Sequence, residues 1–80
     1  MTFKLFSLKN AMEIFNNVEA IRITNKKSRL LIMKDYVPII GDIDGKLEVI
    51  GQNNMVYENV KGYYICFDNV FNFILEELWI

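Results

Sequence analysis

The stretch of residues 29–50 does most to limit what this 80-residue chain can fold into. Its apolar pieces are short, and they are separated every few residues by the only proline, Pro38, by aspartates or by the glycines Gly41 and Gly45. Proline keeps the preceding residue extended and cannot donate to a strand ladder, while Gly and Asp favour turns. The stretch therefore predicts short strands with tight corners: a corner at Pro38, a turn at 42–45 and a strand at 46–50.

Turn-forming residues recur every five to ten positions along the rest of the chain. Strand-favouring, partly alternating runs lie between them, which predicts an all-β fold, either a small sandwich or a barrel. The other expected strands are residues 3–8, 20–24, 29–33, 55–60, 63–67 and 70–75, and the turns include 25–28, 51–54, 61–62 and 68–69. Alternation within these strands predicts a core of Ile21, Ile23, Leu47, Val49, Tyr63, Ile65 and Phe67.

Residues 10–18 fit two different structures. Ala11, Ile14, Phe15 and Val18 have the spacing of one face of an amphipathic helix. The adjacent pair at 16–17, Asn-Asn, is instead typical of a turn. These local signals leave both a two-turn helix and a turn with a short strand open.

Length and composition indicate one domain, residues 1–80, and exclude several classes of protein. The net charge is −1, so no overall positive field attracts nucleic acid or anionic lipid. No window approaches the roughly 18 apolar residues of a membrane span. Hydrophobic residues make up 52% of the chain, which is more than a small domain easily hides. The surplus fits either a surface that faces a partner or a dense aromatic core.

Catalytic chemistry has little support in the sequence. There is no histidine, which removes imidazole acid–base catalysis and most transition-metal sites. The single cysteine, Cys66, excludes an internal disulfide, and its place in an apolar strand predicts a buried structural thiol. The sequence predicts no enzyme, no cofactor and no metal site.

The acidic candidates fail on spacing. Residues 42–45 resemble part of a calcium loop, but Ile40 and Gly51 would then occupy its first and last ligand positions and neither has a carboxylate. Glu76 and Glu77 are adjacent, and neighbours on a strand point to opposite faces. We interpret residues 42–45 as a solvated turn, and Glu76 and Glu77 as part of a solvated terminus.

An ordered pattern along residues 3–77 resembles the N-terminal domain of the epsilon subunit of F-type ATP synthases, called delta in mitochondria. The pattern consists of an alternating strand at 3–5, a Val-Glu pair at 18–19 that leads into a β run, and a glycine and strand at 45–50. The family motif Pro-Gly-His-Ala-Pro-Leu reads Lys-Asp-Tyr-Val-Pro-Ile at 34–39, so Pro38 remains from its core and the histidine position holds Tyr36.

The resemblance implies a β-sandwich of two sheets with about ten short strands, and a turn with a short strand at 10–18. It implies a non-catalytic central-stalk (rotor) subunit at the foot of the gamma subunit, which couples ATP turnover to rotation. Its other partners would be the alpha and beta subunits, indirectly, and a membrane ring in a complete synthase. We therefore expect a cytoplasmic protein, peripheral to the membrane through its complex. The family's C-terminal two-helix domain is expected to be lacking, and with it nucleotide binding.

The altered motif makes a docking loop the expected site, with Arg29, Asp35, Tyr36 and Pro38 as partner-interface residues. One alternative is the same role in a paralogous motor that hydrolyses ATP for transport or movement without a proton channel. An alternative of another class is a small β-barrel that binds single-stranded nucleic acid. For it, residues 26–29 supply a small basic corner, and Tyr63 and Tyr64 supply rings on which bases stack.

Overall fold

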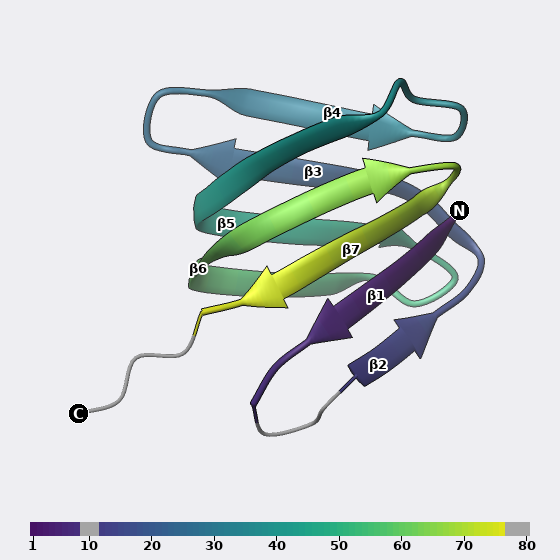
Figure 1. Cartoon of the computed structure of the whole chain (residues 1–80), viewed down its shortest axis with the longest axis horizontal. Helices are drawn as coiled ribbons and strands as arrows, with labels where there is room; N and C mark the ends of the chain where they lie inside the picture. The colour runs from purple at the N-terminus through teal and green to yellow at the C-terminus, as the bar shows by residue number, and fades with distance from the viewer. Residues whose placement is uncertain (9–11, 77–80) are drawn as a thin grey trace.

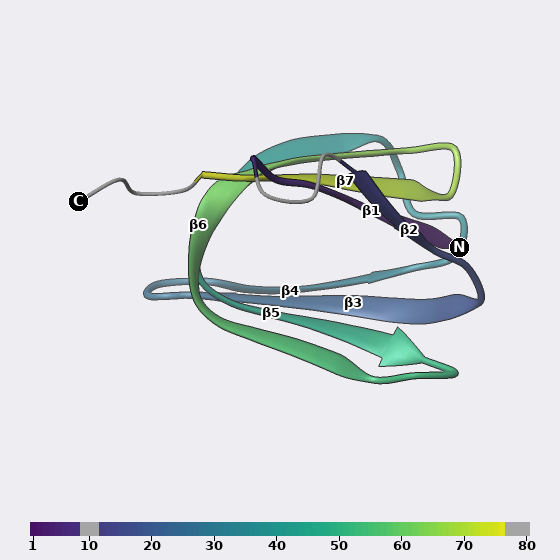
Figure 2. The same cartoon turned by 90° about the horizontal axis from the view of Figure 1, so that it is seen from below.

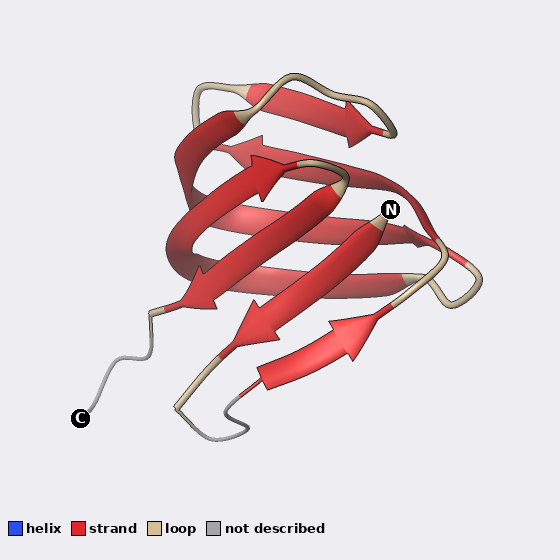
Figure 3. Ribbon diagram, turned by 45° about the vertical axis from the view of Figure 1, so that its right-hand side comes forward, coloured by secondary structure: helices blue, strands red, loops and turns tan. Residues whose placement is uncertain are grey.

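The computed structural model describes residues 1–8 and 12–76, and every regular element in them is a β-strand (Figures 1 and 3). The strands are β1 (Thr2–Phe6), β2 (Met12–Phe15), β3 (Val18–Asn25), β4 (Arg29–Met33), β5 (Ile39–Gly51), β6 (Met55–Phe67) and β7 (Val70–Leu75). They form one mixed sheet in the order β2-β1-β7-β6-β5-β3-β4, in which β1 and β7 are parallel and the other pairs antiparallel. The all-β prediction is confirmed. Within the described residues, no helix is present that could cross a membrane.

The sheet folds over itself into two layers, because β5 and β6 run through both (Figure 2). Layer 1 contains β2, β1, β7, the second half of β6 and the first half of β5. Layer 2 contains β4, β3, the second half of β5 and the first half of β6. This arrangement is compatible with the expected sandwich. The described residues hold seven strands where about ten were expected, since β5 and β6 each span 13 residues.

The bend in the β5–β6 hairpin explains why two predicted turns are wrong. Residues 42–45 and 61–62 lie inside β5 and β6, whose register shifts between Gly45 and Leu47. On the β6 side the extra residue is at Glu58–Asn59, and Asn59 has a left-handed φ of 54°. A bulge of this kind bends a strand and strengthens its twist.

Two glycines are required at this bend because backbone from a neighbouring strand passes close to each. A Cβ on Gly45 would meet the Thr24 carbonyl oxygen, and a Cβ on Gly62 would meet the Ile74 carbonyl oxygen. The same residue types favour turns, which is why the sequence pattern indicated corners here.

Most other local predictions are confirmed. Residues 12–15 form a strand, so the helix alternative is wrong for the described part of 10–18, while residues 9–11 lie outside the description. The strands predicted at 29–33 and 70–75 match β4 and β7. The turn at Asp68 and Asn69 has positive φ at both residues, 53° and 63°, as a two-residue hairpin between twisted strands requires.

The core lies between the two layers and is rich in aromatic rings. Its fully buried large side chains are Phe3, Phe71, Phe73, Ile21, Ile32, Ile43, Leu47 and Val49. The Phe3 ring lies 5.8 Å from Phe15 and 6.0 Å from Phe71, and Tyr64 stacks on Phe71 with centroids 5.2 Å apart. The predicted burial of Ile21, Ile23, Leu47 and Val49 is confirmed.

The predicted burial of Tyr63, Ile65 and Phe67 is wrong. These side chains are exposed, and Tyr64 and Cys66 point into the core instead. Residues 63–67 are apolar at every position, so a pattern of alternation does not distinguish their two faces.

Candidate docking surface

The outer surface of layer 1 is covered by apolar side chains. We call it the apolar face and define it by Phe6, Met12, Ile14, Ile40, Tyr63, Ile65, Phe67 and Ile74. Three of these are largely open to solvent: Ile40 is 75% exposed, Phe67 62% and Tyr63 59%. Side chains on alternate residues of a strand point to one side, so these residues lie opposite Phe71, Phe73 and Tyr64 of the core.

The register of the strands makes the apolar face continuous. Ile40 pairs with Ile65 across β5 and β6, and Tyr63 pairs with Ile74 across β6 and β7. Ile74 is opposite Phe6 of β1, which in turn is opposite Met12 of β2. The same face also carries Lys4, Asp42 and Asn72, interspersed among the apolar side chains. A continuous apolar surface of this kind on a small domain is typical of an interaction site.

The outer surface of layer 2 has a different character. Arg22 Nη1 lies 3.5 Å from Glu48 Oε2, and Lys46 Nζ lies 3.7 Å from Glu48 Oε1. Exposed Leu31 and Val56 stand beside this network. Surface ion pairs of this type contribute little stability, but they make this outer surface polar. The two outer surfaces are therefore unequal, and the apolar one is on layer 1.

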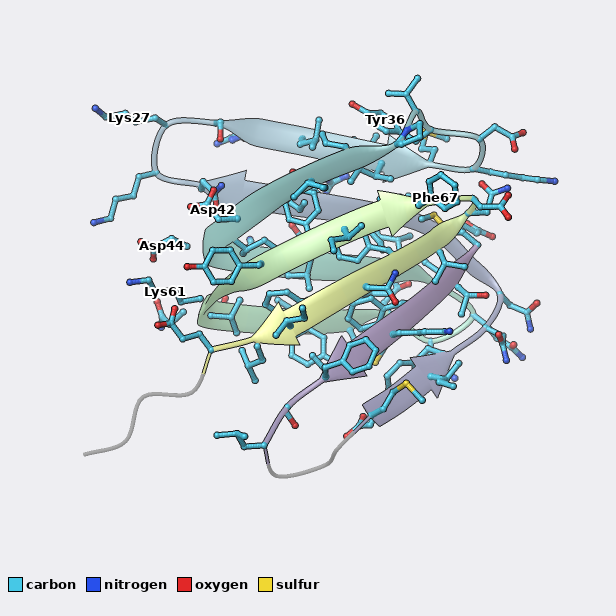
Figure 4. The ribbon with its side chains drawn as sticks, viewed as in Figure 1. Lys27, Tyr36, Asp42, Asp44, Lys61 and Phe67 are labelled. Carbon is cyan, nitrogen blue, oxygen red and sulfur yellow. The ribbon has the colours of Figure 1, made fainter. Side chains whose placement is uncertain are left out.

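The loop between β4 and β5 lies beside the apolar face at one end of the two layers, where Figure 4 labels Tyr36 and Phe67. Its backbone is held by the β6–β7 turn: the Asp35 N–H donates to Asn69 Oδ1 at 2.6 Å, and Asn69 Nδ2 donates to Asp35 Oδ1 at 3.2 Å. Asp35 has a left-handed φ of 65°, which Asp and Asn tolerate better than most residues. We call this end the tip.

Three of the four predicted interface residues meet at the tip. Asp35, Tyr36 and Pro38 line an open hollow of about 370 Å³ together with Phe67, Asp68 and Asn69. The fourth, Arg29, begins β4 next to the turn of Lys26 and Lys27, at the far end of the strand. Figure 4 shows Lys27 and Tyr36 at opposite ends of the molecule. The structure therefore groups Asp35, Tyr36 and Pro38 and separates Arg29 from them.

The exposed side chains of Ile40, Tyr63, Ile65 and Phe67 were not predicted as a site. Ile40 belongs to an apolar pair, and the other three belong to a run that is apolar on both faces. A strand that is apolar on both faces indicates that both faces are in contact with other groups. The all-apolar run at 63–67 is therefore the sequence feature that indicates an apolar outer face.

The residues considered for chemistry do not assemble a reactive centre. Cys66 is buried as predicted, and burial raises the pKa of its thiol above the usual 9.0, which keeps it protonated and unreactive at neutral pH. Asp42 and Asp44 lie within β5, and Glu76 is exposed, while Glu77 lies outside the described residues. Across residues 1–8 and 12–76, no three His, Cys, Asp or Glu side chains come together as metal ligands would.

The pair of rings considered for nucleic acid is divided between two environments. Tyr63 is on the apolar face, but Tyr64 is buried against Phe71 and Gly41 and has no face open to a base. Burial raises the pKa of the Tyr64 hydroxyl above 10.0, with smaller contributions from Tyr36, Asp42 and Cys66. Tyr63 and Tyr64 therefore do not form a shared stacking surface.

Comparison with known proteins identifies no family for this sequence. No protein-family model matches the sequence, and a search among curated proteins gave no match.

Proposed function

We propose that this chain is a non-catalytic binding subunit, of the central-stalk type found in F-type and F-type-like rotary ATPases. It docks through the apolar face on a gamma-type subunit, and it contacts the catalytic alpha and beta subunits indirectly through that partner. The order of sequence motifs along residues 3–77 supports the stalk assignment, and the two-layered β fold is compatible with it.

One observation carries the proposal: the two outer surfaces differ, and the apolar one is continuous across five strands. Desolvating such a surface contributes about 25 cal/mol per Å² of apolar area buried. Stable interfaces have an apolar core and a polar rim. Ile65 and Ile74 lie centrally, while Lys4 and Asp42 supply polar positions for orienting a partner.

The tip extends this docking surface. Tyr36 has an aromatic side chain and Pro38 a rigid one, and both line the same hollow as Phe67. The hydrogen bonds between Asp35 and Asn69 hold the loop in place before a partner binds. Preorganised loops lose less entropy on binding than mobile ones. In this proposal the loop fixes the partner's orientation and the apolar face supplies most of the affinity.

The test is purification of the native complex with a tag on this chain. We expect a gamma-type subunit and the alpha and beta subunits to be recovered with it. Tyr63→Lys places a charge in the apolar face, and we expect it to abolish recovery. Val56→Lys is the matched control, because Val56 is 56% exposed, close to the 59% of Tyr63, but lies on the outer surface of layer 2.

Two results contradict the proposal. One is recovery of the chain alone under gentle conditions. The other is equal recovery with Tyr63→Lys and Val56→Lys when both variants unfold at the temperature of the unmodified chain. Recovery with nucleic acid, reversed by raising the salt concentration, would favour the single-stranded nucleic-acid module instead.

A further inference from the structure

The outer edge of β4 is an open position in the sheet. β4 is the last strand in the order β2-β1-β7-β6-β5-β3-β4, and it pairs with β3 on one side. Edge strands that are left flat and unprotected are templates for a further strand, so proteins usually cover or interrupt them. β4 contains neither proline nor a bulge.

The pairing of β3 and β4 fixes which backbone groups face this edge. The Asn25 N–H donates to the Ser28 carbonyl at 2.9 Å across a two-residue turn, which makes Asn25 and Ser28 a hydrogen-bonded pair. Hydrogen-bonded and non-hydrogen-bonded pairs alternate along an antiparallel ladder, so Leu30 and Ile32 bond to β3. The N–H and C=O groups of Arg29, Leu31 and Met33 therefore point outward.

Part of the neighbouring edge is already closed. At the bend of β5, Asn25 Nδ2 donates to the Asp42 carbonyl at 3.2 Å, and Asn25 Oδ1 accepts from the Asp44 N–H at 2.9 Å. This amide takes the place that a further strand would take on β5. On β4 the Met33 carbonyl accepts from the Tyr36 N–H at 3.2 Å, which leaves Arg29, Leu31 and the Met33 N–H facing outward.

The charge around this edge selects the kind of strand that fits it. Residues 26–34 carry four cationic side chains and no acidic one: Lys26, Lys27 and Arg29 are exposed at one end of β4, and Lys34, followed by exposed Asp35, at the other. On the solvent side between them, Leu31 is 45% exposed and Met33 54%. A second copy of β4 would bring two cationic edges together, so self-pairing is disfavoured. An acidic strand complements the edge, because opposite charges across neighbouring strands stabilise the pair.

We propose that β4 is a strand-addition site for an extended acidic segment of a partner protein. The segment adds to the sheet beside Arg29–Met33 through backbone hydrogen bonds. It places carboxylates opposite Arg29 and near the two lysine-bearing ends, and an apolar side chain opposite Leu31. This site is separate from the apolar face and does not depend on the proposed function.

The experiment selects peptides from a displayed library of random 12-residue sequences against the full chain. We expect enrichment of sequences in which Asp or Glu flanks alternating apolar residues. For the most enriched peptide, amide shifts in the ¹⁵N-labelled chain should be largest at Arg29, Leu31 and Met33. Leu31→Pro removes an outward N–H while sparing the bonds to β3, and it should weaken binding at least tenfold. Arg29→Glu leaves the backbone intact and should weaken it at least fivefold.

The matched control is Leu8→Pro, whose exposed side chain lies beyond the end of β1, and we expect it to leave peptide binding unchanged. The proposal is overturned if selected peptides bind Leu31→Pro as well as the unmodified chain while that variant remains folded by circular dichroism. It is also overturned if no acidic sequence is enriched, or if the chain sediments as a dimer that Leu31→Pro dissociates. In the last case the occupant is a second copy.

Discussion

The alternation of residues 63–67 makes a sharp prediction about two adjacent tyrosines. Tyr64→Ala removes a ring that is 5% exposed, stacks on Phe71 and covers the backbone of Gly41. Tyr63→Ala removes the same atoms from a side chain that is 59% exposed. The two substitutions are chemically identical, so a difference in their effects measures only which way the strand faces.

The expected magnitudes follow from burial. An aromatic side chain buries about 150–250 Å², which at about 25 cal/mol per Å² corresponds to roughly 4–6 kcal/mol. Measured costs of truncating buried aromatic residues to alanine are about 3–5 kcal/mol. Tyr63→Ala loses cross-strand contacts on an exposed face, which are worth about 1 kcal/mol or less. At about 0.05–0.15 kcal/mol per residue, the 80-residue chain has a total stability of about 4–12 kcal/mol.

The assay is urea and thermal unfolding followed by circular dichroism. Each kcal/mol shifts the midpoint of a domain of this size by about 4–8 °C. Tyr64→Ala should therefore lower Tm by roughly 12 °C or more, and Tyr63→Ala by a few degrees. If Tyr64→Ala does not fold, Tyr64→Leu fills part of the space and should fall between the two. Equal effects, or a larger loss for Tyr63→Ala, would refute the register assigned to β6.

Three further predictions concern the alkaline limit, the bend and the tip. Burial raises the thiol pKa of Cys66 above its usual 9.0, so the unfolded chain loses this proton at a lower pH than the folded chain. The free energy of unfolding should therefore not depend on this thiol below pH 9, and it should fall as the pH rises above 9. Thermal melts of Cys66→Ala between pH 8 and 10 should show a weaker decline. Gly62→Ala should destabilise by about 1–3 kcal/mol, measured by urea unfolding, because the added Cβ meets the Ile74 carbonyl oxygen. Asn69→Gly keeps the left-handed turn but loses both hydrogen bonds to Asp35, so hydrogen exchange should accelerate at the Asp35 amide with a loss of about 1 kcal/mol.

Strands bounded by strong punctuation were predictable from the sequence. β4 and β7 were placed at the residues where they occur, and the turn at Asp68 and Asn69 followed from the tolerance of these residues for left-handed backbone. The short strand at 12–15 was not decided by local signals. Its apolar residues fit a helical face, and its pairing with β1 is a contact between segments that local sequence does not report.

The bent hairpin was the main feature that local signals misrepresented. The sequence predicts turns at Gly45 and Gly62, whereas both lie within long strands where another backbone passes close by. A glycine at a turn and a glycine at a bend look alike in sequence. For the same reason the sequence predicts a solvated turn at Ile43, which is fully buried.

The candidate site was predictable in part. Asp35, Tyr36 and Pro38 are predicted as a docking loop because they lie in the altered motif at 34–39, and the structure adds Phe67 and Asn69 from a distant turn. The apolar face is assembled from five strands, so the all-apolar run at 63–67 indicates only the part of it that lies on β6. It depends on which residues of an all-apolar run point outward, and that parity is set by the bulge at Asn59.

The apolar face and the edge of β4 belong to different layers, and this separation has a consequence for assembly. The face lies on the outside of layer 1, and Leu31 and Arg29 lie on layer 2. Two partners can therefore occupy the chain together, one held by desolvation of apolar area and one by backbone hydrogen bonds and charge. If the surfaces are independent, Tyr63→Lys should abolish recovery of the gamma-type subunit yet change affinity for the selected acidic peptide by less than twofold. Leu31→Pro should do the reverse, since effects at distant sites without shared contacts are additive. Loss of both activities in either folded variant would mean that a single surface serves both.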